Sequence, residues 1–148
     1  TDTAGNYGGG DWGTLSNIVP TIAGMVNAAN GQYNYGPFQV YVSQTQYNQA
    51  ALSYFTDGSG DTGLSRVAQL AMIAGVSSLP ATTLPDGEIL LVQMTAEYME
   101  LAEAIGMQVR EWSTADGTES IFKVMVIGTP KIKARYGNQT GIVHATGA

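Results

Sequence analysis

Apolar residues recur at helical spacing early in the chain and then alternate with polar ones. Ile18, Ile22 and neighbouring apolar residues predict a helix that begins after Asn17 as N-cap and ends at Asn30-Gly31. The alternating segment 37–42 that follows is rich in β-forming residues, so it predicts a strand with one buried face.

Two further helices are predicted around a polar loop. Ser43 and Gln46 form a capping-box pattern, which predicts a second helix that runs to Tyr54. The segment 56–63 has no large apolar side chain and contains three glycines, so we expect an exposed loop there. A third helix is predicted from Leu64, with Gly75 as its end.

The second half of the chain is richer in strand patterns. The run 89–92 is apolar on both faces and predicts a central strand, and a short helix is predicted over 96–104. Segments 107–113 and 120–127 flank turn residues and predict a β-hairpin, and 130–145 predicts one or two more strands. Helices and strands follow no regular βαβ order, so the predicted fold class is α+β, with a mixed central sheet flanked by about three helices.

Composition narrows the possible functions. Only 12% of the 148 residues are charged, and the net charge is −6, whereas globular proteins average about 25% charged residues. Residues 1–100 contain eight acidic residues and one basic residue, so we expect no direct nucleic-acid binding. The chain has no cysteine and no apolar run as long as a membrane span, which excludes disulfides and predicts no membrane insertion.

Several motifs resemble functional sites but lack an essential part. Gly8, Gly10 and Gly13 have dinucleotide-binding spacing without a predicted strand before them, and the segment 57–68 lacks the glycine and glutamate of a calcium loop. His144 is the only histidine, and no serine lies in a nucleophile elbow. The acidic residues Glu97, Glu100 and Glu103 are interpreted as a solvated helix face. We therefore predict no catalytic residue, no cofactor and no metal site, and hence no enzyme.

Three stretches in the chain resemble shell proteins of the Hong Kong 97-type fold, in particular the encapsulin-like branch of tailed-phage major capsid proteins. An aromatic-Gly-Pro-aromatic entry into a strand lies at 33–43, a Pro-Asp-Gly turn into an apolar strand lies at 84–92, and the closing strands lie at 111–144. The resemblance implies the axial domain of a major capsid subunit, a single α+β domain with terminal strands over 14–148. The glycine-rich segment 1–13 is expected to be a flexible lead-in or linker.

The resemblance also implies partners, a location and a site. Copies of the chain would meet in five- or six-fold rings of an icosahedral shell, within a virion assembled in the bacterial cytoplasm. The loop between the second and third helices would then rim the pore on the ring axis. The candidate pore-loop residues are Asp57, Gly58, Ser59, Gly60 and Asp61.

Two other functions stay open at this stage. One is the shell of an encapsulin compartment, which would enclose cargo proteins and not a genome. The other is a small α+β enzyme or a carbohydrate-binding module that uses Trp12, Trp112 or the face formed by Glu97 and Glu103.

Overall fold

The apolar run 89–92 lies in the middle of a five-stranded sheet, in a computed structural model that describes residues 2–5, 7–134 and 139–148. The sheet order is β1-β7-β4-β2-β3. The strands are β1 (Asp2–Ala4), β2 (Phe38–Ser43), β3 (Ile73–Leu79), β4 (Glu88–Gln93) and β7 (Ile142–Thr146). Strand β4 runs antiparallel to both neighbours, β2 and β7, whereas β2–β3 and β1–β7 are parallel. The predicted mixed sheet with a central apolar strand is confirmed.

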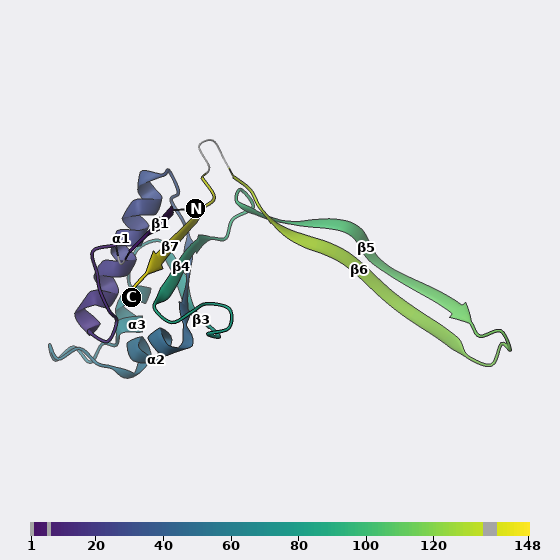
Figure 1. Cartoon of the computed structure of the whole chain (residues 1–148), viewed down its shortest axis with the longest axis horizontal. Coiled ribbons are helices and arrows are strands. Elements are labelled where there is room, and N and C mark those ends of the chain that lie inside the picture. The colour runs from purple at the N-terminus through teal and green to yellow at the C-terminus, as the bar shows by residue number, and fades with distance from the viewer. Residues whose placement is uncertain (1, 6, 135–138) are drawn as a thin grey trace. The chain divides into compact units, whose positions relative to one another are not determined.

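Three described α-helices accompany this sheet (Figure 1): α1 (Ile18–Gly31), α2 (Gln44–Leu52) and α3 (Gly63–Ala68). The apolar stripe of α1, which includes Ile22 and Met25, is fully buried together with Val40, Leu91 and Val143 of the sheet. Alternate residues of β2, β4 and β7 therefore form one wall of the core, and α1 forms the opposite wall.

The N-terminal segment belongs to this core. Strand β1 pairs with β7, and Trp12 is only 1% exposed. A Cβ atom on Gly9 would lie 1.8 Å from Thr21 Oγ1 and 2.8 Å from the Asn17 carbonyl, so Gly9 lets this segment lie directly against η1 (Leu15–Asn17) and α1. The flexible lead-in expected over residues 1–13 thus contains a strand and a core residue, and its glycines allow close packing.

Helix α1 has the predicted bounds, whereas one predicted cap bond is not formed and two helix ends differ from prediction. The Asn17 side chain does not cap α1 but donates to the Asp11 carbonyl at 3.0 Å. Ser43 does cap α2, by accepting from the Gln46 amide, but α2 ends at Leu52. Helix α3 ends at Ala68, and Gly75 lies within β3, because the parallel pairing with β2 extends the chain there. Tertiary pairing overrides local helix propensity in this segment.

The remaining strands form a separate two-stranded sheet, β5 (Met99–Ser113) and β6 (Ser120–Ile132). Residues 99–133 accordingly form their own compact unit, here called the hairpin unit, and residues 1–98 with 134–148 form the globular unit. The single domain expected over 14–148 stays a prediction, because two compact units within one chain can belong to one domain. Figure 1 shows the long twisted ribbon of β5 and β6.

The predicted hairpin is confirmed, and it is longer than expected. The helix predicted over 96–104 is wrong: Met99, Glu100 and Glu103 are in β5, paired with residues 128–132 of β6. Helix-favouring residues in this segment form a strand because most of residues 99–104 have a cross-strand partner.

Candidate functional site: an acidic loop tied to Arg66

The loop between α2 and α3 projects from the globular unit as a closed turn. Its base is joined by a bridge between Tyr54 and Thr62 and by a hydrogen bond from the Phe55 amide to the Asp61 carbonyl at 3.0 Å. Residues 56–60 are all exposed, as the sequence predicts. At its end, Thr62 and Ser65 form a reciprocal capping box that begins α3.

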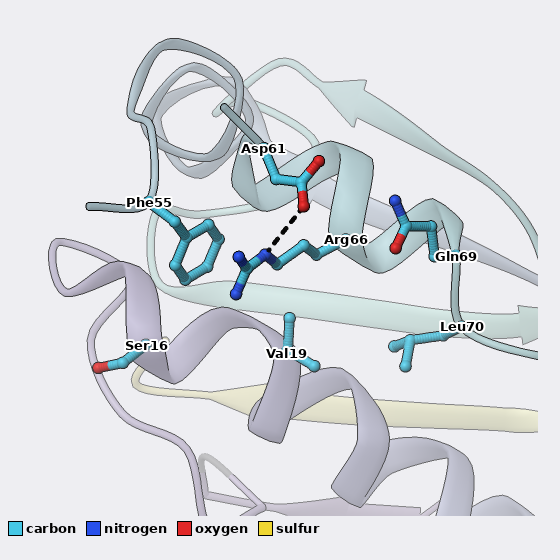
Figure 2. Close-up of a pocket in the computed structure, with 7 residues that line it drawn as sticks. All are labelled: Ser16, Val19, Phe55, Asp61, Arg66, Gln69 and Leu70. Carbon is cyan, nitrogen blue, oxygen red and sulfur yellow. Dashed lines mark ion pairs between the residues drawn. The ribbon is translucent and has the colours of Figure 1, made fainter. Parts of the chain in front are cut away.

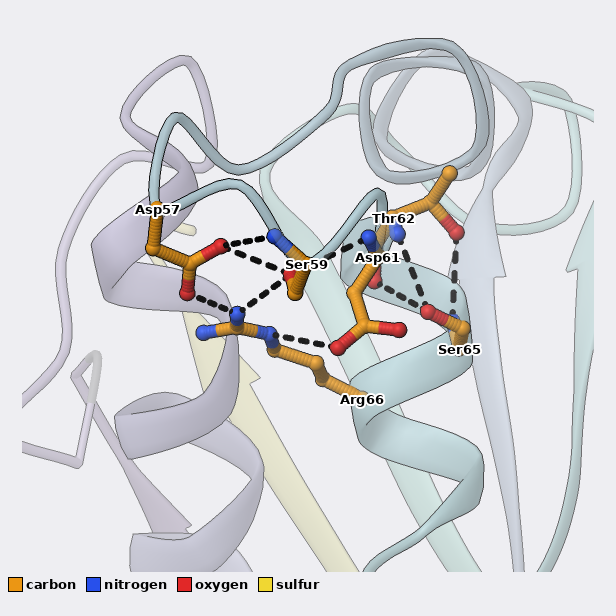
Figure 3. Close-up of polar contacts among 6 residues, drawn as sticks. All are labelled: Asp57, Ser59, Asp61, Thr62, Ser65 and Arg66. Atoms are coloured by element: carbon orange, nitrogen blue, oxygen red, sulfur yellow. Dashed lines mark hydrogen bonds and ion pairs between the residues drawn. The ribbon is translucent and has the colours of Figure 1, made fainter.

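Within the loop, Asp57 and Ser59 organise the backbone (Figure 3). The carboxylate of Asp57 accepts from the Ser59 amide at 3.1 Å and from the Ser59 hydroxyl at 2.6 Å. The same hydroxyl oxygen accepts from the Asp61 amide at 3.2 Å. Gly58 and Gly60 have φ values of +81° and +73°, a region open to glycine, which allows the loop to turn twice in five residues.

Arg66 of α3 ties this loop to the body of the globular unit. Its guanidinium forms ion pairs with both Asp57 and Asp61, donates to the Ser59 hydroxyl at 3.0 Å, and lies 3.8 Å from the centre of the Phe55 ring. Hydrogen bonds from Ser59 and from Arg66 hold the pKa of the Asp57 carboxyl well below its usual range, and the pKa of Arg66 is raised by Asp57. The single positive charge of Arg66 thus offsets one of the two negative charges that Asp57 and Asp61 contribute.

A hollow of about 710 Å³ lies beside this cluster (Figure 2). Its lining residues are Ser16, Val19, Phe55, Asp61, Arg66, Gln69 and Leu70. Ser16 is its one hydroxyl, and the lining contains no histidine that could act as its base. The arrangement can therefore hold a surface loop in a fixed shape.

The other candidate residues belong to other elements. His144 of β7 contacts Glu88 of β4 at 3.1 Å between Nε2 and Oε2. Glu100 forms ion pairs with Lys131 at 3.6 Å and Lys133 at 2.5 Å, and the pKa of Glu100 is lowered chiefly by the hydrogen bond from Lys133. Since Glu100 and Glu103 are an odd number of residues apart in a strand, they belong to opposite faces.

Some sequence alternatives lose their support here. Trp12 is fully buried in the globular unit, so it cannot stack on a sugar. Among the described residues there is no group of three acidic or histidine side chains placed to hold a metal ion. The described helices include none that is long and apolar enough to cross a bilayer. The sequon residue Asn138 lies outside the described residues.

What sequence reasoning missed at this site is the role of Arg66 and Phe55. Arg66 is the one basic residue among the first 100, and it follows the acidic loop by five residues. This isolation was a usable signal, because a lone cation near two carboxylates is a natural ion-pair partner.

Taken together, the mixed sheet, the helices and the long hairpin form an α+β fold. A solved structure shares it: the crystal structure of a virus-like particle from Pyrococcus furiosus superimposes with a TM-score of 0.60 at 14% sequence identity. The match covers 97% of this chain and 55% of the other, so the chain spans about half the length of that protein. The sequence matches no protein-family model and no curated protein.

Proposed function

We propose that this chain is a structural subunit of a closed protein shell and has no enzymatic activity. The observation that carries this proposal is the shared fold with a virus-like particle protein over 97% of the chain. A low content of charged residues fits large contacts between subunits, because charge is depleted at interface centres. The partners would be further copies of the chain.

Within such a shell, we assign the loop residues Asp57–Asp61 to the rim of a pore at a five- or six-fold axis. The loop is exposed, and Arg66 holds it in a defined shape. Compensation by Arg66 leaves about one net negative charge per copy where two carboxylates were expected to gather, which reduces the repulsion between copies around an axis.

Cysteine cross-linking tests the ring assignment, because the chain has no cysteine of its own. In a Thr56→Cys variant, which has one thiol per chain, a short bis-maleimide reagent should join neighbouring copies around the axis into dimers in high yield. The control is Thr82→Cys, at another exposed site of the globular unit. An equal yield of dimer from both variants would contradict the pore-rim assignment. Electron microscopy of the same sample would show whether rings of five or six copies, or shells, form.

Of the two shell types, we favour the compartment shell over the phage capsid, because the matched particle resembles a virus and is not itself a virion. The contents of purified particles separate them. Nuclease-protected DNA of genome length would favour a capsid in a virion, whereas enclosed protein without such DNA would favour a compartment.

A further inference from the structure

The hairpin unit has two chemically different faces. Because opposite residues of an antiparallel pair share a face, the register of β5 and β6 assigns each side chain. One face, here called the apolar face, presents large apolar side chains that are between 51% and 70% exposed. Its apolar residues are Leu101, Val109, Phe122, Val124, Val126 and Ile132.

The charges of the two faces are opposite in sign. The only ionised strand residues on the apolar face are Glu103 and Glu111. The other face, here called the cationic face, has Arg110 directly opposite Lys123, beside Trp112. Like charges placed opposite each other destabilise a strand pair, so this pair favours an anion above it.

None of these four charged residues is compensated within the described part of the chain. The ion pairs of the hairpin unit join Glu100 to Lys131 and Lys133, which leaves Arg110 and Lys123 on one face and Glu103 and Glu111 on the other. The two faces are thus complementary: each carries exposed apolar side chains, and their unpaired charges are equal in number and opposite in sign.

A hairpin of two strands is also marginally stable in water by itself. Pairing of a further strand along its edges is disfavoured. Strand β5 is interrupted by two register shifts between Glu103 and Gln108, and β6 contains Pro130, which has no amide hydrogen to donate. We therefore expect another protein surface to pack on the faces of this unit and not along its edges.

We propose that hairpin units of neighbouring copies stack, with the apolar face of one copy on the cationic face of the next. The proposal rests on the proposed function, since it needs a second copy. In an in-register stack, Glu111 would lie about one residue rise, ~3.3 Å, along the strand from Arg110 and Lys123 of the next copy. Side chains of this length can meet across the ~10 Å between stacked sheets.

Such a contact is heterologous, since different faces meet, and it repeats from copy to copy in rings or open stacks. Its area is modest. A hairpin about 45 Å long and about 10 Å wide offers on the order of 450 Å² per face, at the low end for specific interfaces. The stack is thus expected to be weak for a single pair and to strengthen when many copies are held together.

Cross-linking of the full chain tests which faces meet. Val124→Cys places a thiol on the apolar face and Met125→Cys places one on the cationic face. With a bis-maleimide reagent that matches the ~10 Å sheet spacing, an equal mixture of the two variants should yield at least tenfold more dimer than either alone. Most dimer from Val124→Cys alone, or no excess over Glu119→Cys in the turn, would overturn the proposal.

Charge reversal supplies an independent test by sedimentation velocity at low salt. Glu111→Lys and Lys123→Glu should each weaken self-association, and a mixture of the two variants should restore it. Glu119→Lys is the matched control, because it makes the same change of charge outside both faces and should associate as the unaltered chain does. No effect of Lys123→Glu, or an equal effect of Glu119→Lys, would overturn the stack.

The outcomes separate this contact from the proposed function. Rings or shells in electron micrographs without face-to-face cross-links would overturn the stack and leave the shell function standing. Face-specific cross-links in open stacks, without rings or shells under any condition, would support the stack and count against the shell function.

Discussion

The two units of this protein differ in how much of their apolar side-chain surface is exposed to solvent. In the globular unit, β4 and α1 bury their apolar residues against each other, and Ile22 and Leu91 are fully buried. In the hairpin unit, Leu101 and Phe122 are 70% and 62% exposed. Burial of apolar surface supplies most of the favourable free energy of folding, so the core of the globular unit can account for the stability of that unit. The hairpin unit has no such core, and its stability depends on contacts with another surface. The difference indicates where contacts with other molecules belong.

The largest expected effect comes from matched truncations in the two units. Leu91→Ala removes a fully buried side chain and should lower the free energy of unfolding by about 2–5 kcal/mol. Leu101→Ala removes an exposed one and should change it by less than about 0.5 kcal/mol. Urea denaturation followed by circular dichroism measures both. Equal losses would mean that the hairpin unit has a core of its own.

A second test asks whether the N-terminal segment belongs to the globular unit. Gly9→Ala places a methyl group against Thr21 and the Asn17 carbonyl, and it should cost about 1–3 kcal/mol in unfolding free energy. Gly5→Ala is the control, since nothing lies within 4 Å of its added carbon. If thermal denaturation found both variants equally stable, residues 1–13 would be the loose lead-in that the sequence suggested.

Removal of the hairpin unit should have a smaller effect on stability. Residues 99 and 132 are paired, so their Cα atoms lie about 5 Å apart and a three-residue glycine-serine linker can replace 99–133. The shortened chain should melt within about 4 °C of the full chain. Differential scanning calorimetry is the measurement. Loss of a cooperative transition would show that the globular unit requires the hairpin unit to fold.

The smallest expected effect compares one carboxylate from each unit as the pH falls. The pKa of Asp57 is lowered chiefly by the hydrogen bond from Ser59 and then by Arg66, and that of Asp116 is lowered chiefly by the hydroxyl of Thr114. Both pKa values are depressed in the folded state, so the contribution to stability is present above about pH 4 and is lost as the pH falls through the folded pKa.

Carboxyl chemical shifts in NMR spectra would follow both titrations. Asp57 should take up its proton at the lower pH, and added salt should raise its pKa more than that of Asp116, because only Asp57 has an ionic partner. The same salt response at both residues would mean that Arg66 does not tie the loop in solution.

Sequence reasoning found those elements whose apolar pattern is set by burial in the core. The helix beginning near Ile18, the strand at 37–42 and the central strand at 89–92 are all confirmed, because their apolar spacing reflects packing within the globular unit. The helix predicted over 96–104 failed for the opposite reason. Residues 99–104 of that segment are at least partly exposed in the hairpin unit, so their pattern reflects pairing with a distant strand and not a buried face.

The candidate site was predictable in part. Glycine and aspartate between two helices indicated the exposed loop, and its exposure is confirmed. Its fixed shape depends on Arg66 and on the Phe55 ring, whose contacts follow from the way α3 starts immediately after the loop. The role of residues 57–61 at a ring axis stays a prediction, since a symmetry axis is a property of an assembly and not of one chain.

The two tryptophans give each unit its own spectroscopic reporter. Trp12 is enclosed in the globular unit, whereas Trp112 on the hairpin unit is 46% exposed. Fluorescence from an enclosed indole lies to the blue of that from a hydrated one. A Trp112→Phe variant would leave Trp12 as the only tryptophan, and iodide quenching of its fluorescence would report unfolding of the globular unit. A Trp12→Phe variant would leave Trp112, and protection of its fluorescence from iodide would report covering of the hairpin unit.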